Sequence, residues 1–274
     1  MNLVIKEALY KAVVQMREAT LIPQKEAMLI LGEVLGKDMT WLVAHENDEV
    51  QIDEHFFDLV ARRANNEPLE YILGRASFYG KEFLVDKRVL IPRPETELLV
   101  DKVLELARDI QTPHIVEIGC GSGIISIMLS LLFPKARMTA VDISQDALHV
   151  AMMNAKKFGV EEKINFVLGN YLDGVEEKID ILVSNPPYIA QNEPLHVGLS
   201  YEPSLALYGG VVGDEMLKHI IDLFKERAIG ALVCEMGYDQ RASILKYASD
   251  KGFEAEFYKD LADLDRGFWI RSQK

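Results

Sequence analysis

The stretch HIVEIGCGSGIISIMLSLLF, residues 114–133, decides the fold. It begins as a buried β-strand, passes through three closely spaced glycines and ends in an apolar run typical of a buried helix. Gly119 permits a tight turn, while Gly121 and Gly123 remove side chains so that a ligand can approach the backbone. A dinucleotide-binding fingerprint would place its third glycine at position 124, where this chain has isoleucine. The spacing favours a nucleoside with an amino-acid tail over a pyrophosphate, with a ligand-free turn as the alternative.

Strand-like and helix-like segments continue to alternate after this stretch. Such alternation predicts an α/β fold, in which a doubly wound, mostly parallel sheet is covered by helices on both faces. The seven predicted strands lie at residues 114–118, 138–141, 164–168, 179–184, 231–236, 254–257 and 268–271. Ligands of such sheets bind beyond the carboxyl ends of the strands, which is where the glycine loop stands.

The residues that precede the sheet follow other patterns. Apolar residues first recur at helical spacing, with Pro23 suited to the first turn of a helix and Gly36 to the end of one. Strand-forming residues interrupted by a glycine then predict a hairpin, which Pro92 and Pro94 end. We therefore expect a helical bundle for substrate recognition over residues 1–75, a β-hairpin linker over 76–92 and a catalytic domain over 93–274.

Composition bounds the classes of protein to which the chain can belong. Its 274 residues, 49% of them apolar, suffice for one large core and a smaller satellite domain. The net charge of −13 would repel a nucleic-acid backbone and favours a protein or small-molecule substrate. We expect Cys120 and Cys234 to be reduced, with a single bridge as the alternative, and the histidine spacing predicts no metal site. No apolar run is long enough to span a bilayer, so we expect a cytoplasmic protein.

Two side chains near the strand ends suit a nucleoside. Asp142 follows the second predicted strand, where nucleotide-binding sheets place an acid against the ribose. Its alternative role is the N-cap of the next helix, but Ser144 can fill that role. Tyr171, in the loop after the third strand, can lay its ring on an adenine face or simply anchor the core. Cys120 has no nearby base in the sequence, so we interpret it as a small filler rather than a nucleophile.

The tetrapeptide Asn185-Pro186-Pro187-Tyr188 directly follows the fourth predicted strand. Two consecutive prolines have no N–H groups and fixed φ angles, so the loop is stiff and its backbone offers only acceptors there. With the Asn185 side-chain carbonyl, these acceptors suit the two N–H donors of a planar –NH2 group, and Tyr188 can pack flat against the same plane. Such a nitrogen is a poor nucleophile, so holding it in line with a methyl donor would be the loop's main contribution. A plain proline turn is the alternative.

The glycine loop, Asp142 and the Asn-Pro-Pro-Tyr loop resemble the class I methyltransferase fold in its amino-methylating branch. That branch includes adenine-N6, cytosine-N4, guanine-N2 and protein-glutamine enzymes. Three further segments, PLEYILG at 68–74, LIPRPETE at 90–97 and YEPSLAL at 201–207, resemble the peptide chain release factor glutamine methyltransferase family, PrmC/HemK. With the helical domain and the hairpin, the similarity covers nearly the whole chain.

The resemblance implies N5-methylation, by S-adenosyl-L-methionine, of the glutamine in the Gly-Gly-Gln motif of release factors, with S-adenosyl-L-homocysteine as the product. It implies that the cofactor is held by Gly119, Cys120, Gly121, Ser122, Gly123, Asp142, Tyr171 and Asn185. It also implies that Asn185, Pro186 and Tyr188 are catalytic and that, with Pro187, they form the glutamine pocket. Arg93 and Glu95 are further candidates for substrate binding, with a solvated helix start as the alternative. Asn170 departs from the pattern, since many class I methyltransferases carry an acid there that meets the adenine amine.

The motifs leave other functions open. A ribosomal-protein glutamine methyltransferase would share them, and a nucleic-acid amino methyltransferase would share the Asn-Pro-Pro-Tyr chemistry because a flipped base presents the same –NH2 group. The acidic charge disfavours the latter. A non-catalytic binding protein on the same fold is the alternative from a different class. We expect release factors as partners, without a membrane or direct contact with nucleic acid.

Overall fold

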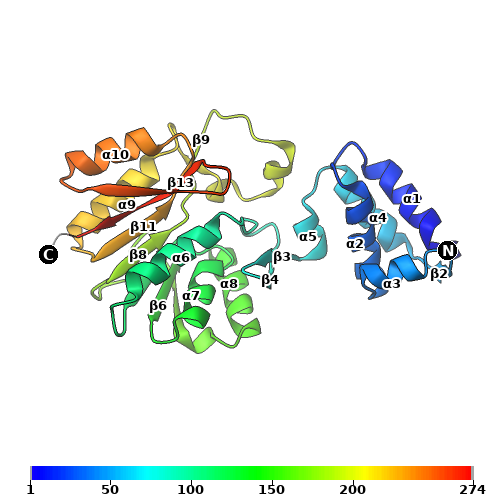
Figure 1. Ribbon diagram of the computed structural model, residues 1–274, viewed down its shortest axis with the longest axis horizontal. Coiled ribbons are helices and arrows are strands. Elements are labelled where there is room, and N and C mark those ends of the chain that lie inside the picture. Colours follow the sequence, from blue (N-terminus) through cyan, green and yellow to red (C-terminus); the bar gives the residue numbers. More distant parts are fainter. Residues whose placement is uncertain (1, 273–274) are drawn as a thin grey trace. The chain divides into compact units, whose positions relative to one another are not determined.

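The computed structural model describes residues 2–272, and Figure 1 shows its ribbon. The chain divides into two compact units. The first comprises the residues up to Arg75 together with Leu195–Tyr201, and the second comprises Ala76–Pro194 and the residues from Glu202 onward. The first unit is therefore discontinuous in sequence, because a short later segment returns to it.

The first unit is a helical bundle. Its elements are β1 (Asn2–Val4), α1 (Ile5–Met16), α2 (Pro23–Leu35), α3 (Met39–Ala44), β2 (Glu49–Gln51), α4 (Glu54–Ala64) and α5 (Leu69–Leu73). Pro23 is the first residue of α2, and Gly36 ends that helix in the left-handed conformation that glycine favours. The returning segment contains the short 3-10 helix η2 (Val197–Tyr201), and the Tyr201 hydroxyl donates to the carbonyl of Asn65 at 2.8 Å.

A hairpin follows the helical residues, formed by β3 (Arg75–Phe78), whose first residue is counted with the first unit, and β4 (Lys81–Leu84). These strands end earlier than the predicted run, and irregular backbone leads from them to α6 (Thr96–Ala107). The helix thus begins two residues after Pro94, because residues 94 and 95 form a turn. The segment between β4 and α6 is free to line a cavity, since no sheet occupies its backbone.

A seven-stranded sheet forms the centre of the second unit. Its order is β12-β13-β11-β8-β5-β6-β7. The strands are β5 (His114–Ile118), β6 (Arg137–Asp142), β7 (Ile164–Leu168), β8 (Ile181–Ser184), β11 (Ala231–Glu235), β12 (Ala255–Lys259) and β13 (Asp265–Arg271). All pairs are parallel except those that β13 makes with β11 and β12. The mostly parallel, doubly wound sheet that the sequence predicts is confirmed.

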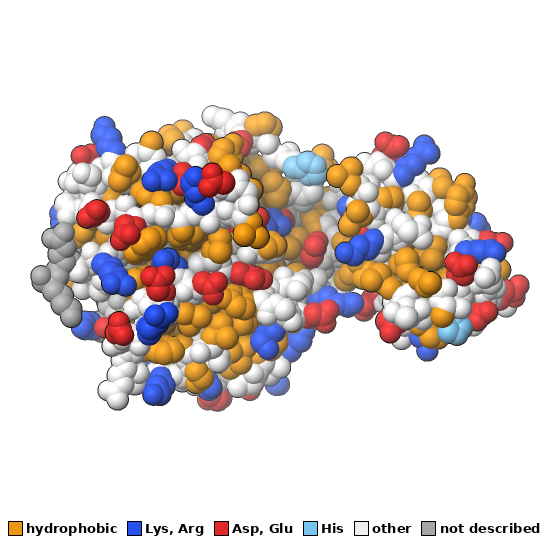
Figure 2. Space-filling view, viewed as in Figure 1, with side chains coloured by type: hydrophobic (Ala, Val, Ile, Leu, Met, Phe, Trp, Pro, Cys, Tyr) orange, Lys and Arg blue, Asp and Glu red, His pale blue; other side chains and the backbone are white. Residues whose placement is uncertain are grey.

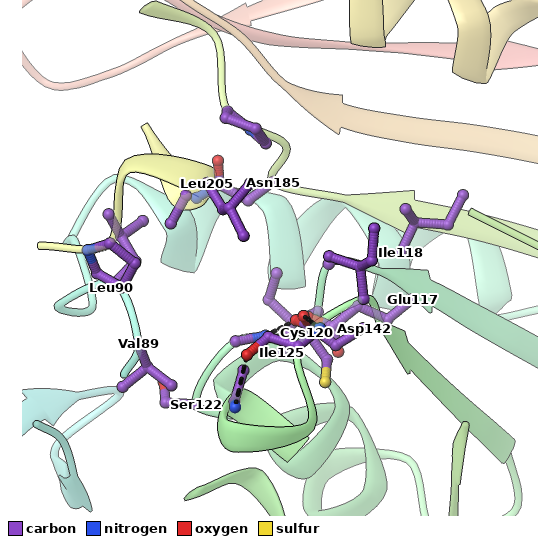
Figure 3. Close-up of a pocket in the computed structure, with 18 of the residues that line it drawn as sticks. Val89, Leu90, Glu117, Ile118, Cys120, Ser122, Ile125, Asp142, Asn185 and Leu205 are labelled. Atoms are coloured by element: carbon purple, nitrogen blue, oxygen red, sulfur yellow. Dashed lines mark hydrogen bonds between the residues drawn. The ribbon is translucent and has the colours of Figure 1, made fainter. Parts of the chain in front are cut away.

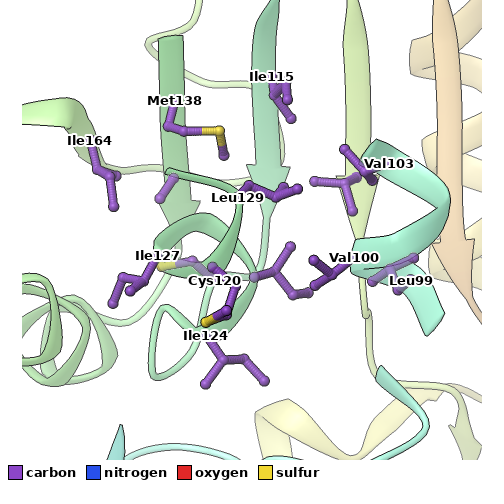
Figure 4. Packing of buried hydrophobic residues seen from close by; sticks show 14 of the residues in the cluster. Leu99, Val100, Val103, Ile115, Cys120, Ile124, Ile127, Leu129, Met138 and Ile164 are labelled. Carbon is purple, nitrogen blue, oxygen red and sulfur yellow. The ribbon is translucent and has the colours of Figure 1, made fainter. Parts of the chain in front are cut away.

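Helices cover both faces of this sheet, and adjacent residues of a strand point to opposite faces. Ile115 of β5 packs with α6, α7 (Ile124–Leu132) and α8 (Gln145–Lys157), in the core shown in Figure 4. Its neighbour Val116 packs with α9 (Glu215–Glu226) and α10 (Arg241–Asp250). The remaining short elements are η1 (Glu161–Lys163), β9 (Ile189–Ala190), η3 (Ser204–Ala206) and β10 (Tyr208–Gly210).

The winding direction of the sheet reverses at β5, which lies between β6 and β8. Ile118, the last residue of β5, pairs with Val141 of β6 on one side and with Ser184 of β8 on the other. The residues that follow these strands therefore emerge at one edge, at the switch point where α/β sheets bind ligands. This register brings the glycine loop, Asp142 and Asn185 together, although they lie far apart in the sequence.

The surface of the described chain carries charges of both signs. On the face in Figure 2, Lys and Arg side chains are interspersed with Asp and Glu side chains over the second unit. Across residues 2–272, no helix has the length and apolarity needed to cross a bilayer. Within the same range, no group of three or more His, Cys, Asp or Glu side chains is arranged to hold a metal ion.

Candidate active site

The glycine loop after β5 presents its backbone to a cavity at the switch point. Gly119 and Gly121 have φ angles of 72° and 53°, and a Cβ added to either would meet nothing within 4 Å. The amides of Gly119 and Cys120 donate to the carbonyl of Val141 at 2.8 and 3.1 Å, which fastens the loop to β6. Gly119, Cys120, Gly121 and Ser122 all line the cavity. The positive φ angles explain the glycines, and the open space beside them leaves room for a ligand.

The third glycine of the motif has a packing role instead. Gly123 does not line the cavity, and its φ angle is 81° at the start of α7. A Cβ at this position would lie 3.0 Å from the Ala151 Cβ and 3.2 Å from the Ile127 Cδ1. Gly123 therefore lets α7 and α8 approach closely, whereas the sequence suggested contact with the ligand.

Asp142 stands at the end of β6 with its carboxylate held in place. One oxygen accepts from the Gly121 amide at 2.8 Å and the other from the Ser144 amide at 2.9 Å. Burial raises the pKa of Asp142 above its ordinary value, and these backbone hydrogen bonds oppose the rise. Ser144 caps α8 by accepting from the Ala147 amide at 3.2 Å, so Asp142 is not needed as the cap. Each carboxylate oxygen keeps an acceptor position that can face hydroxyl groups in the cavity.

Glu117 is a cavity residue to which the sequence analysis gave no role. Its carboxylate is fully buried within β5, and one oxygen accepts from the amide (2.9 Å) and the hydroxyl of Ser126. The other oxygen, Oε1, is buried without a hydrogen-bond partner among residues 2–272, and Glu117 lines the cavity. Burial raises the pKa of Glu117 to about 8. A charged residue inside the apolar run HIVEI was the signal that could have identified it.

The buried Glu117 carboxyl should make stability fall as the pH rises. Because its pKa is about 8 in the folded chain and 4.5 ordinarily, the folded state holds a proton between these values that the unfolded state has released. The wild type should therefore lose unfolding free energy as the pH rises from about 5 to about 9. Glu117→Gln cannot ionise and should not show this loss, so its unfolding free energy relative to the wild type should increase by roughly 1–3 kcal/mol over that range. Urea denaturation of both proteins across this range measures the difference. If the difference in unfolding free energy between the two proteins did not change with pH, the raised pKa assigned to Glu117 would be wrong.

Asn185 follows β8 and its side-chain amide is hydrogen-bonded on one side. Its Nδ2 donates to the Thr96 Oγ1 at 3.1 Å, and Thr96 donates to Glu235 at 2.7 Å. Asn185 and Pro187 line the cavity, whereas Pro186 and Tyr188 do not. The Tyr188 hydroxyl is instead directed to Glu235 at 3.4 Å. Thr96 and Glu235 are two further residues that the sequence analysis did not identify.

Glycines support the Asn-Pro-Pro-Tyr loop from behind. β9 follows the loop and pairs in parallel with β10, so the backbones of the two segments lie close together. A Cβ on Gly209 would lie 2.4 Å from the Pro187 carbonyl oxygen, and one on Gly213 would lie 2.5 Å from that of Tyr188. No side chain fits at these distances. The position of the loop therefore depends on glycine at both sites.

The segment before α6 forms another wall of the cavity. Arg93 lines it, and its guanidinium is paired with the buried carboxylate of Glu202. The second oxygen of Glu202 accepts from the Ile91 amide at 2.9 Å, which ties the start of the YEPSLAL segment to this wall. Glu95 does not line the cavity. Arg93 is thus paired with a buried acid, and its side chain is partly exposed.

The remaining surface of the cavity is mostly apolar and comes from several elements. Figure 3 shows Val89, Leu90, Ile118 and Leu205 around the space bounded by Asn185 and the glycine loop. Tyr171 and Asn170 line it after β7, and the Tyr171 ring meets the edge of His219 with 4.3 Å between centroids. Such an apolar cavity with a few fixed polar groups is typical of a small-molecule site.

Family models match both units of the chain. The PrmC N-terminal domain matches residues 7–74, and the Methyltransferase small domain matches residues 94–199. The Release factor glutamine methyltransferase of Chlorobaculum tepidum is 38% identical over 268 residues, which cover 92% of this chain and 91% of that protein. Its namesake from Koribacter versatilis is 36% identical over 244 residues, covering 85% of this chain and 86% of that protein.

Other matches are longer proteins or more distant structures. The Bifunctional methyltransferase of Rickettsia conorii is 34% identical over 272 residues, covering 87% of this chain and 52% of that protein. This chain spans about half the length of the bifunctional relatives that it matches. Among solved structures, the hMettl16 catalytic domain in complex with MAT2A 3′UTR hairpin 6 is 16% identical, with a TM-score of 0.60 over 83% of this chain and 86% of that one. At that identity the likeness shows a shared fold.

Proposed function

The chain belongs to the family of release factor glutamine methyltransferases, and on that premise we propose that it methylates a glutamine side-chain amide of peptide chain release factors. The methyl donor would be S-adenosyl-L-methionine, and the acceptor would be the N5 nitrogen of the glutamine in the Gly-Gly-Gln motif. The observation that carries the proposal is the meeting of the glycine loop and Asn185 at one cavity, at the ends of adjacent strands.

The polar groups of the cavity fit this cofactor. Asp142 has free acceptor positions for the two ribose hydroxyls, and the unpartnered Oε1 of Glu117 becomes a buried acceptor for an ammonium group once this carboxyl is ionised. Gly119 and Gly121 leave open space beside the backbone for the amino-acid tail. The apolar side chains suit a flat base, and Tyr171 lies among them. Arg93, Cys120, Ser122 and Asn185 complete the set of residues that would hold the cofactor or face it.

When bound, the cofactor supplies a methyl group on a positively charged sulfur. The protein must hold the acceptor nitrogen, because the lone pair of an amide nitrogen is delocalised. Asn185 Nδ2 is already used by Thr96, so its Oδ1 is the end that can accept from the substrate amide. The backbone carbonyls of the proline loop can take the second proton. Holding both N–H groups aligns the nitrogen and stabilises the positive charge that develops on it.

The two units suggest a division of labour, which we also propose. The helical residues 1–75 would recognise the protein substrate, the segment 76–92 would link the units, and residues 93–274 would bind the cofactor and perform the transfer. Pro186 and Tyr188, which do not line the cavity, would act by fixing Asn185 and Pro187 rather than by touching the cofactor. Glu95 would act only indirectly. We place the reaction in the cytoplasm, without a membrane or nucleic acid as partner.

Methyl transfer from labelled S-adenosyl-L-methionine tests the proposed function. Purified release factor should accept label, and a release factor with the Gly-Gly-Gln glutamine replaced by alanine should not. Ribosomal protein and nucleic acid serve as competing acceptors in parallel reactions. Label on ribosomal protein or nucleic acid alone would refute the choice of substrate. The absence of label on every acceptor would favour a binding protein on a methyltransferase fold.

Asp142→Ala should weaken cofactor binding by roughly 10- to 100-fold. The substitution removes the proposed hydrogen bonds to the ribose and also the acceptor that fixes the Gly121 amide. Isothermal titration calorimetry with S-adenosyl-L-methionine measures the change. Asp146→Ala, at an exposed acid in the first turn of α8, is the matched control and should bind normally. Equal affinities of the two variants would exclude a role of Asp142 in binding.

A further inference from the structure

A buried hydrogen-bond chain stands behind the Asn-Pro-Pro-Tyr loop. Thr96 and Glu235 are each only 1% exposed, and Glu235 is the last residue of β11. Cys234 of β11 pairs with Ser184 of β8, so Glu235 leaves its strand beside Asn185. Thr96, at the start of α6, connects the two side chains through bonds of 3.1 and 2.7 Å. Three separate elements thus converge on one amide.

The hydrogen bonds from Asn185 through Thr96 to Glu235 can run in only one direction when Glu235 is ionised. A carboxylate only accepts hydrogen bonds, so the single proton of the Thr96 hydroxyl is donated to Glu235. The oxygen of Thr96 is then left as an acceptor, and only the –NH2 end of Asn185 can face it. The carbonyl end of Asn185 is consequently turned away from Thr96. The opposite orientation would set two acceptors against each other in a buried place.

We propose that Thr96 and Glu235 are positioning residues that fix which end of the Asn185 amide faces the cavity, and so select a substrate nitrogen that donates. The inference rests on the proposed function. It explains why a site for a –NH2 group contains a side chain that could otherwise present a donor or an acceptor. Thr96 acts through Asn185, and Glu235 acts through Thr96.

Glu235 holds a second residue of the same loop. The Tyr188 hydroxyl donates to its other oxygen at 3.4 Å, and burial raises the pKa of Tyr188 to about 12, so the phenol remains a donor. The Tyr188 carbonyl accepts from the Gln240 side chain at 3.0 Å. One buried carboxylate therefore steadies both ends of the Asn-Pro-Pro-Tyr loop.

The charge of Glu235 depends on several neighbours. Burial raises its pKa to about 7, and Glu95 before α6 adds to the rise, while Arg266 of β13 opposes it. Tyr188 and the buried Tyr258 of β12 are the other titratable groups that face it. When Glu235 is protonated, one of its oxygens becomes a donor, so the direction of the hydrogen bonds through Thr96 to Asn185 is no longer fixed. Methyl transfer should therefore rise with pH through about 7.

Isosteric substitutions test the positioning role. Thr96→Val keeps the shape and removes the hydroxyl, and we expect kcat to fall about ten-fold or more while KM for the release factor changes little. Thr96→Ser restores the hydroxyl and should recover kcat to within about three-fold. The matched control is Thr139→Val, at a buried threonine of β6 that bonds His114 at 3.0 Å outside the cavity, and its kcat should be unchanged. Equal losses in the Val and Ser variants of Thr96 would overturn the proposal.

The amide itself can be observed without methyl transfer. In 15N-labelled protein, the Asn185 side-chain signal is the one missing from Asn185→Ala, and it should shift with a midpoint near pH 7. The shift should vanish in Glu235→Gln and in Thr96→Val, and the rise of kcat with pH should flatten in Glu235→Gln. If the Asn185 signal of Glu235→Gln shifted with pH at the same midpoint as in the wild type, the proposal would be overturned. A wild type that methylates nothing would refute the proposed function, and the amide signal would still decide whether the chain fixes Asn185.

Discussion

Asn185→Ala is expected to lower kcat for methylation of the release factor by about 100- to 1,000-fold. The variant removes the only side-chain carbonyl that the Asn-Pro-Pro-Tyr loop offers to the substrate amide, just after β8, where Asn185 and Pro187 line the cavity. It also leaves the Thr96 oxygen without its donor. Both effects act on the acceptor nitrogen more than on the cofactor, so the loss should appear mainly in kcat.

Single-turnover transfer with saturating cofactor measures this loss directly. Asn165→Ala, at an exposed asparagine of the edge strand β7, is the control and should keep wild-type rates. Cofactor affinity, measured by calorimetry, should change far less than kcat. If Asn185→Ala kept a rate within a few-fold of the wild type, the loop could not be the site that holds the amide.

Gly209→Ala is expected to lower kcat about 100-fold although the residue lies outside the cavity. Its new Cβ would stand 2.4 Å from the carbonyl oxygens of Pro187 and Gly213, so the backbone of the loop must move. A displacement of about 1 Å at a positioned group can cost two orders of magnitude in rate. The same overpacking should destabilise the protein by roughly 1–3 kcal/mol.

A second glycine separates the effect on rate from the effect on stability. Gly230 directly precedes β11, at the end of the strand away from Glu235 and the cavity. A Cβ there would lie 2.7 Å from the Asp180 carbonyl oxygen. Gly230→Ala should therefore lose stability in urea titration and keep kcat at a temperature where it is folded. Comparable losses of kcat in both variants would show that the loop is sensitive to general destabilisation and not to its own displacement.

The sequence predicted most of the sheet because buried parallel strands have a local signature. The predicted runs 114–118 and 164–168 coincide with β5 and β7, and the other five runs differ from their strands by a few residues at the ends. Strand order could not be read locally, yet it decides the site. Ile118 and Ser184 are neighbours only because the winding reverses at β5. The motifs indicated the chemistry, and the register brought them together.

The residues that the sequence analysis missed depend on distant pairing. Thr96 and Glu235 lie 139 positions apart and each alone resembles an ordinary helix or strand end. Apolar lining residues such as Leu90 and Leu205 cannot be told from core residues by type. Tyr188 was expected to lie against the acceptor group, but its hydroxyl is directed to a buried acid in β11 that no local pattern reveals. Gly209 is recognisable only from the backbone packed against it.

The discontinuity of the first unit constrains how the chain can be cut. Because Leu195–Tyr201 belongs with the helical residues, a fragment that starts at Ala76 carries a piece of a domain whose remainder is missing. Tyr201 would lose the carbonyl of Asn65 as its hydrogen-bond acceptor, one residue before Glu202, which ties the chain to Arg93. Residue 75 is thus a boundary for the fold but not a safe site for truncation. An autonomous catalytic fragment would need a redesigned connection across 195–201, and gene fusions that exchange the helical domain would have to exchange that segment with it.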